Sequence, residues 1–425
     1  MGAAFGKLSP SAVHTNRDPN LDVEIPLLPV ENGTEGPLFS MGPGISAFNF
    51  YEGRPSADYL RERVAQIVAA NPWLSGRVVT LKSGKPGLAF ASKPEHRDLS
   101  SCFVDHGKLE GVTTTTTYSA LIEAMEPHSV GTGKVTLDKN VSLFKVSLFE
   151  LEGGNSGLML SISHVLVDGQ GFYQVVGMLD PSAKVISLQP GRKQSMGASI
   201  LDLYPKEKAM YSSYSFLAGL IRNMLVAAPH TFYLNHIQES WLQQGKAQYQ
   251  QGRGEHEPEF ISSNDLITSW VFRHLKADLG SMIVNMRGKM PGLDEQDAGN
   301  YETALSYTAG TYETPGSIRA TLQALMRFPN HQPNEKKMPG KLQRVSMCYA
   351  MVSSWVSLYQ HIELPGTAAF QLHLPVVSLA SVRCLGGGCF TFRPAPGKVA
   401  MLLYTREADV SSAGACPFGD PVMQV

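Results

Sequence analysis

Between residues 158 and 179 the spacing of hydrophobic positions changes from that of a strand to that of a helix. Leu158, Leu160 and Ile162 alternate as they do on one side of a half-buried strand. Apolar residues then recur three and four positions apart over 172–179, as on one face of a helix. The pattern predicts a strand that stops before His164, a turn, and a helix that begins near Asp168.

The same two spacings predict elements along the rest of the chain. Strands are expected at residues 42–51, 77–79, 88–90, 141–151, 282–286, 301–307, 376–384, 389–392 and 399–404, with hairpin turns near 84–87, 153–155 and 386–388. Helices are expected from Ser56 to Asn71, at 118–126, within 206–233, from Ser263 or Asn264 onward, and at 317–328. Residues 113–117 fit either an edge strand or a loop. This mixture indicates an α/β (α+β) protein with helices packed on sheets.

The length of the chain indicates two domains, since 425 residues exceed the usual limit for a single hydrophobic core. Residues 1–36 are rich in Pro, Asn and Gly and are expected to form an irregular arm. We predict a first domain at 1–180, a crossover at 181–258, where the chain becomes polar and rich in Gln and Gly, and a second domain at 259–425.

Composition excludes several classes of protein. The net charge is −1 and no long basic run is present, so nucleic-acid binding is not expected. The five cysteines are odd in number and form no CxxC pair, which favours reduced thiols and argues against a zinc site. No apolar run predicts a secretory signal or a membrane span.

The first residues offer one weak targeting signal. Gly2 could be myristoylated, but Gly6 stands where that signal has Ser or Thr, and a flexible start is the preferred interpretation. We therefore expect a monomeric cytoplasmic protein, with membrane association only if Gly2 is modified.

His164, Asp168 and Gly169 form the candidate site. A histidine has an ordinary pKa of about 6.5, so its imidazole can serve as a base near neutral pH. Asp168 could pair with a cation or cap the helix, and Gly169 could supply a backbone angle that other residues resist. The alternative is purely structural, with Asp168 only an N-cap and His164 a histidine satisfied within the core.

The segment HVLVDG at residues 164–169 resembles the HxxxDG signature of the chloramphenicol-acetyltransferase-like superfamily. Four further segments, in matching order, resemble motifs of the BAHD acyltransferases within it. They are NPWLSGR at 71–77, SSNDLITSWVFR at 262–273, NMR at 285–287 followed by Pro291 and by Gly299 and Asn300, and SSW at 353–355. The family's DFGWG motif is absent after Trp355, which indicates a divergent branch.

This resemblance implies two similar α/β domains with an active-site channel at their interface. It implies that His164 is the general base of an acyltransferase, that acyl-coenzyme A is the co-substrate, and that no cofactor or metal is bound. Asp168 is then structural and paired with Arg287 across the domains. The candidate donors to the oxyanion of the tetrahedral intermediate are Ser353, Ser354 and Trp355.

Two other functions stay open at this point. One is condensation-type transfer from a carrier-protein thioester, which Ser163 disfavours because condensation domains usually carry a second histidine there. The other is a non-catalytic relative that binds a ligand. The acceptor, a small-molecule alcohol or amine, and the length of the acyl chain are not specified by the sequence.

Overall fold

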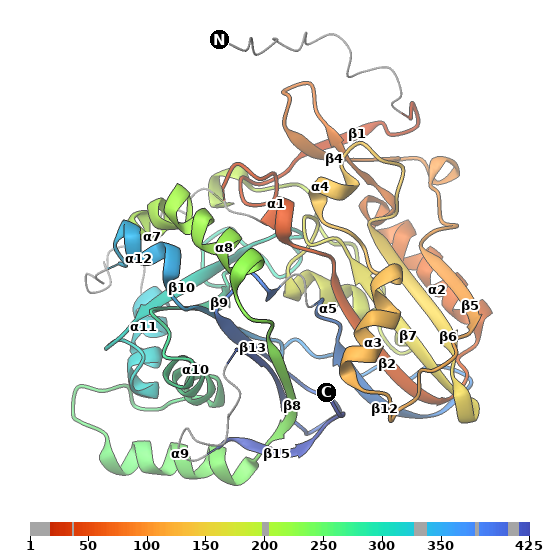
Figure 1. Cartoon of the computed structure of the whole chain (residues 1–425). Helices are drawn as coiled ribbons and strands as arrows, with labels where there is room; N and C mark the ends of the chain where they lie inside the picture. Colours follow the sequence, from red (N-terminus) through yellow and green to blue (C-terminus); the bar gives the residue numbers. More distant parts are fainter. Residues whose placement is uncertain (1–17, 36–37, 198–203, 327–337, 379–381, 407–415) are drawn as a thin grey trace.

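The computed structural model describes residues 18–35, 38–197, 204–326, 338–378, 382–406 and 416–425. Two lobes lie side by side, each built on a mixed β-sheet with helices packed against it (Figure 1). The sheet of the N-lobe contains, in spatial order, β12 (Thr367–Pro375), β2 (Ile45–Gly53), β7 (Asn155–Ile162), β6 (Phe144–Glu150) and β5 (Phe103–Lys108). The sheet of the C-lobe contains β10 (Glu302–Thr308), β9 (Leu279–Asn285), β11 (Tyr349–Ser354), β13 (Gly387–Phe392), β14 (Ala400–Thr405), β8 (Thr231–Ile237) and β15 (Phe418–Pro421).

A small third sheet joins β1 (Val23–Pro26), β4 (Pro86–Phe90) and β3 (Arg77–Thr80). The α-helices are α1 (Leu38–Met41), α2 (Ala57–Ala70), α3 (Tyr118–Met125), α4 (Gly133–Thr136), α5 (Gly169–Gly177), α7 (Pro205–Tyr211), α8 (Tyr214–Val226), α9 (Glu239–Gly252), α10 (Ser263–His274), α11 (Pro315–Met326) and α12 (Lys341–Ser346). Short 3₁₀ turns occupy Pro72–Ser75, Pro94–His96, Glu126–His128 and Glu152–Gly154. None of the described helices is both long enough and apolar enough to cross a membrane.

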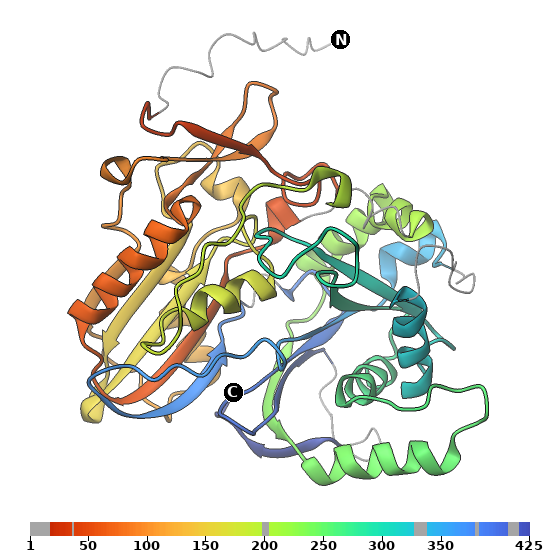
Figure 2. The ribbon, with the colours of Figure 1, turned by 180° about the vertical axis from the view of Figure 1, so that it is seen from behind.

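Local sequence signals explain most of the N-lobe. The Ser56 side chain accepts a hydrogen bond from the Tyr59 amide and so caps α2, whose apolar stripe is buried. Figure 2 shows this helix lying along one face of the five-stranded sheet. The predicted hairpin of β6 and β7 is confirmed, with Leu148 opposite Leu158 and Gly153 at a positive φ of 74° in its turn. Residues 113–117, for which two interpretations were open, form a loop.

Two strands pair with a sheet outside the segment to which the predicted boundaries assign them. β12 falls within 259–425 but pairs with β2 of the N-lobe, with Leu374 opposite Phe48. β8 falls within 181–258 but pairs with β14 of the C-lobe, with Leu402 opposite Leu234. A strand of the C-terminal part of the chain thus completes the sheet of the N-lobe. The boundaries 1–180, 181–258 and 259–425 stay a prediction about domains.

Some predicted elements were wrong. β12 was missed because it is an edge strand whose register shifts twice, so its hydrophobic alternation is broken. The strand expected at 376–384 is not present at 376–378 or 382–384, and 379–381 lie outside the described residues. α9 buries only Leu242, which is why its sequence read as a polar connection. Gly387 and Gly388 belong to β13 and do not form a hairpin turn. Glycine is needed at 388 because β13 pairs closely with β11, and a Cβ there would lie 2.1 Å from the Met351 carbonyl oxygen.

Candidate active site

A cavity of about 1240 Å³ opens where the two lobes meet. Its walls come from both sheets and from α7, α8 and α10. Much of the lining is apolar and includes Met41, Ile45, Phe216, Leu220, Met351, Val377, Leu385 and Phe390. Polar and charged side chains from both lobes also line it, among them His164, Glu302, Ser353 and Ser354.

His164 stands in the turn that follows β7 and is half-buried. Its Nδ1 is buried and has no hydrogen-bond partner among the described residues. The ring lines the cavity, so Nε2 is the nitrogen that a substrate can reach. His164 is therefore not a histidine satisfied within the core, which was the structural alternative.

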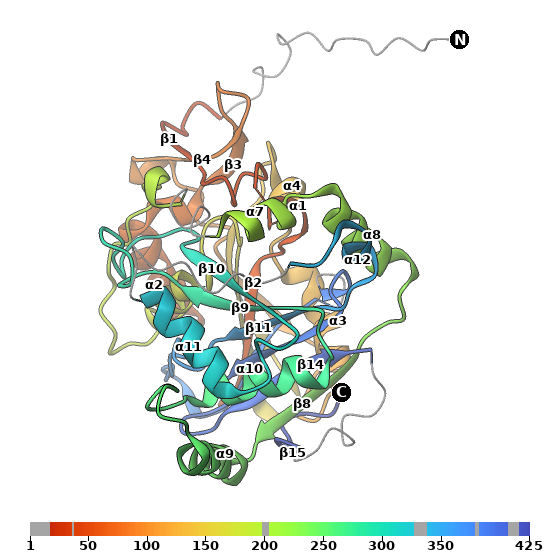
Figure 3. The same cartoon turned by 90° about the vertical axis from the view of Figure 1, so that its left-hand side faces the viewer.

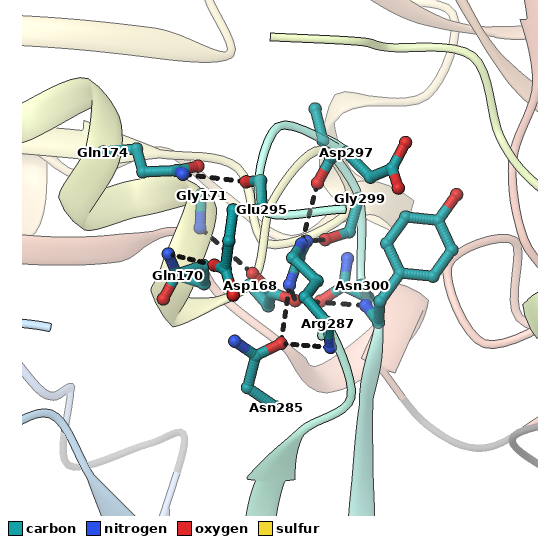
Figure 4. Close-up of polar contacts among 12 residues, drawn as sticks. Asp168, Gln170, Gly171, Gln174, Asn285, Arg287, Glu295, Asp297, Gly299 and Asn300 are labelled. Carbon is teal, nitrogen blue, oxygen red and sulfur yellow. Dashed lines mark hydrogen bonds and ion pairs between the residues drawn. The ribbon is translucent and has the colours of Figure 1, made fainter. Parts of the chain in front are cut away.

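Asp168 both caps α5 and pairs with a cation, which are the two roles that the sequence suggested for it. As the N-cap of α5 it accepts a hydrogen bond of 3.1 Å from the Gly171 amide through Oδ1. Its Oδ2 lies 2.6 Å from Nη1 of Arg287 and also accepts from the Tyr301 amide at 3.0 Å (Figure 4). Both charged side chains are almost fully buried. The predicted Asp168–Arg287 ion pair is thus present, and it joins α5 of the N-lobe to the segment between β9 and β10.

The rest of the Arg287 guanidinium is also paired. Nε donates to the Asp297 carbonyl at 2.9 Å, and Nη2 donates to the Gly299 carbonyl at 2.8 Å. The guanidinium carbon lies 5.2 Å from the centre of the Tyr301 ring, within cation–π range. Arg287 therefore fixes the loop between β9 and β10 as well as the helix that carries Asp168.

A second buried ion pair holds the turn that carries His164. Nε of Arg192 lies 2.8 Å from Oε2 of Glu31, and both side chains are buried completely. Arg192 Nη2 donates to the carbonyls of Val165 and Leu166. The His164 carbonyl accepts from Asn300 at 2.7 Å, and Asn300 in turn donates to Glu31.

The three carbonyls of this turn, at residues 164–166, are thus all held by side chains from distant segments. Sequence reasoning missed Glu31 and Arg192 because no local pattern connects two residues separated by 161 positions. Glu31 lies in the predicted irregular arm and Arg192 in the predicted crossover. Neither stretch has a periodic pattern that could indicate a buried pair.

Glu302 is a further site residue that the sequence did not reveal. It begins β10, is half-buried and lines the cavity with His164. Burial raises the pKa of its carboxyl to about 7, an effect that the positive charge of a protonated His164 opposes. The site therefore holds a carboxyl, that of Glu302, which can take up or release a proton near neutral pH.

The three candidate oxyanion donors lie together at the end of β11. Ser353, Ser354 and Trp355 all line the cavity. The Trp355 indole N–H donates to Oγ of Ser353 at 3.1 Å, so the indole is already engaged. Because Ser353 Oγ accepts that bond, its own O–H remains available to donate to a substrate.

Gly169 was expected to supply a backbone angle that other residues resist, and this expectation was wrong. Its φ is not positive, so it does not supply a left-handed backbone angle. A Cβ built on Gly169 would lie 3.2 Å from Cδ1 of Leu358, and the Trp355 indole nitrogen is also within contact distance. Glycine here allows the first turn of α5 to pack closely against the segment that follows β11.

No cluster of three or more His, Cys, Asp or Glu side chains suited to a metal ion occurs in the part of the chain that the structure describes. The cysteines described there form no disulfide with one another.

The two-lobed, mixed α/β architecture matches a chloramphenicol-acetyltransferase-like fold, which is the fold that the resemblance implied. No family model matches the sequence. No curated protein matches it either. The likeness is therefore one of structure.

Three solved structures illustrate the likeness. TRI101 of F. graminearum complexed with ethyl coenzyme A has a TM-score of 0.58 at 11% identity, covering 91% of this chain and 95% of its own. Vinorine synthase has a TM-score of 0.56 at 11% identity, covering 90% and 89%. The first condensation domain of the CDA synthetase has a TM-score of 0.55 at 14% identity, covering 91% of each chain. The structural neighbours thus include a coenzyme A complex and a condensation domain.

Replacing Glu302 by glutamine is expected to change how stability depends on pH. The folded carboxyl has a pKa near 7, against an ordinary value of 4.5, so the folded protein favours its neutral form. The stability that this form contributes is present below about pH 4.5 and is lost as the pH rises through 7. Glu302→Gln cannot ionise. Its free energy of unfolding, relative to that of the wild type, should therefore rise by about 1–2 kcal/mol as the pH is raised from 5 to 8.

Urea unfolding of Glu302→Gln and of the wild type at pH 5 and at pH 8 measures this change in the free energy of unfolding. The exposed carboxylate of Glu152, replaced by glutamine, is the matched control. An equal effect of Glu302→Gln at pH 5 and pH 8 would show that the carboxyl has an ordinary pKa.

Proposed function

We propose that this protein is an acyl-coenzyme A-dependent acyltransferase. It moves an acyl group from the thioester of coenzyme A to a hydroxyl or amine of a small molecule, with His164 as the general base. Acyl-coenzyme A is a co-substrate in this reaction.

The observation that carries this proposal is the position of His164. The imidazole faces a large cavity between two lobes, with Nδ1 buried and with the backbone of its turn held at three carbonyls. A structure with the same fold was solved with ethyl coenzyme A, which supports coenzyme A as the carrier of the acyl group. The apolar lining of the cavity suits an acyl chain.

The residues suggest the order of proton transfers. Nε2 of His164 accepts the proton of the acceptor hydroxyl or amine as its oxygen or nitrogen bonds to the thioester carbon. The carbonyl oxygen becomes an oxyanion, to which Ser353 donates its hydroxyl hydrogen. When the oxyanion collapses, the carbon–sulfur bond breaks and the thiolate leaves with the proton that His164 had accepted.

A screen of acyl-coenzyme A donors against pooled alcohols and amines tests the proposal. We expect release of free coenzyme A that depends on both donor and acceptor. Release should be followed by chromatography, since the half-exposed thiols of Cys348 and Cys416 would react with thiol reagents. A ligand-induced rise in melting temperature without release from any donor would instead identify a non-catalytic binding protein.

The structural likeness to a condensation domain supports one competing function, in which the acyl donor is a carrier-protein thioester. The same donors attached to a phosphopantetheinylated carrier protein distinguish the two. Turnover with the carrier and none with free coenzyme A thioesters would favour condensation-type transfer.

A further inference from the structure

Helix α8 presents an apolar face to solvent. Twelve large hydrophobic side chains are exposed in the described part of the chain, and this one helix carries six of them. They are Tyr214, Leu217, Ile221, Met224, Leu225 and Val226, with exposed fractions from 38% to 92%. Leu342 of α12, which is 90% exposed, adds a seventh. We call these seven side chains the α8 ridge.

The ridge is not the face by which α8 packs on the protein. Phe216 and Leu220, on its other side, are buried and line the cavity. A Cβ on Gly219 would lie 2.4 Å from the Arg344 carbonyl oxygen, so glycine allows α12 to approach α8 closely. α8 therefore packs on the protein and on α12 with its other side, and the ridge faces outward.

The figures show where the ridge is carried. α8 and α12 lie next to each other in two perpendicular views, and the second view shows them at the edge of the C-lobe (Figures 1 and 3). Because the two helices are neighbours there, Leu342 can extend the apolar surface of α8.

The charged side chains of α8 and α12 are all basic. Arg222 of α8 and Lys341 of α12 are exposed, and neither helix contains an Asp or Glu. An apolar stripe beside basic side chains, with a tyrosine at one end, has the chemistry of a helix that lies in the interface of an anionic bilayer.

We propose that the α8 ridge docks the protein on the surface of a lipid bilayer that contains anionic lipids. A protein partner fits less well, because protein interfaces rely on about one hydrogen bond per 100–200 Å² and only Tyr214 of the ridge can make a side-chain hydrogen bond. The docking needs no modification of Gly2, and in this it differs from the expectation drawn from the sequence.

Docking would place the bilayer one helix away from the cavity. Phe216 and Leu220 form part of the cavity wall on the opposite side of α8 from the ridge. If the proposed acyl transfer is correct, this arrangement suits donors or acceptors with long apolar chains. The docking itself does not depend on that activity.

Sedimentation of the full-length protein with vesicles tests the proposal. The protein is produced in bacteria, which lack the myristoyl transferase, so Gly2 cannot contribute. We expect binding to phosphatidylcholine vesicles to strengthen about tenfold when phosphatidylserine is included, and to weaken as salt is added.

Two kinds of variant identify the surface. Leu225→Glu with Val226→Glu should reduce binding to both vesicle types about tenfold or more, because two carboxylates would enter the apolar interface. Arg222→Glu with Lys341→Glu should reduce binding to the anionic vesicles only. Val135→Glu, at an exposed valine of α4, is the matched control and should bind like the wild type.

Two results would overturn the proposal. One is vesicle binding that the Leu225→Glu, Val226→Glu variant leaves unchanged. The other is no vesicle binding together with a dimer in light scattering that the same variant dissociates, which would make a second copy of the chain the occupant of the ridge. Circular dichroism of each variant confirms that loss of binding is not loss of the fold.

Discussion

Replacing His164 by alanine is expected to lower kcat/KM for acyl transfer by about 10²–10⁴. The variant keeps the cavity and the donor hydroxyl of Ser353 but loses the nitrogen that accepts the acceptor's proton. Without that nitrogen the nucleophile must attack while still protonated, or must lose its proton to water. Initial rates of coenzyme A release, measured with the donor and acceptor that the screen identifies, give the ratio directly.

The control for this variant is His256→Ala, which removes an exposed histidine from the loop after α9 and should leave the rate unchanged. The melting temperature of His164→Ala should stay close to that of the wild type, because His164 Nδ1 makes no hydrogen bond among the described residues. A His164→Ala protein with the full wild-type rate would exclude the imidazole as the base and with it the proposed mechanism.

The local part of this site could be predicted from the sequence. The change of hydrophobic spacing between residues 158 and 179 depends on side chains that are close in the chain, and it gave the end of β7, the turn and the start of α5. The N-cap role of Asp168 follows from the same short-range chemistry. The Asp168–Arg287 contact spans 119 positions, and only the resemblance to a known family indicated it.

The long-range part could not be predicted. Glu31 and Arg192 meet in the core although each comes from a segment without regular periodicity, and burial makes their pairing obligatory. β12 crosses to the N-lobe because its partner β2 offers an open sheet edge, which is a property of the assembled sheet. Glu302 gave no signal because a carboxylate at the start of a strand usually faces water, and here the other lobe encloses it.

The buried ion pair below His164 leads to the largest expected effect on stability. Arg287→Met is expected to lower the free energy of unfolding by about 3–5 kcal/mol, since it leaves the Asp168 carboxylate buried without its cation. Asp168→Asn should cost less, because an asparagine side-chain oxygen can still accept from the Gly171 amide and cap α5.

The double variant tests whether the two side chains act as a pair. Arg287→Met combined with Asp168→Asn should cost about 1–3 kcal/mol less than the sum of the single changes, because neither then leaves a buried charge unpaired. Urea unfolding of all four proteins measures the cycle. The exposed pair of Arg61 and Asp58 is the control, and Arg61→Met should change stability by no more than about 0.5 kcal/mol.

The same cycle separates a structural from a functional role for the pair. Asp168 and Arg287 hold the helix after the His164 turn against the segment between β9 and β10, so losing either should move the imidazole relative to the C-lobe wall of the cavity. A misplacement of about 1 Å can cost about 10²-fold in rate, so activity should fall even where the variant remains folded. If Arg287→Met instead unfolded as readily as the wild type and kept its rate, the pair would hold neither the fold nor the base in place.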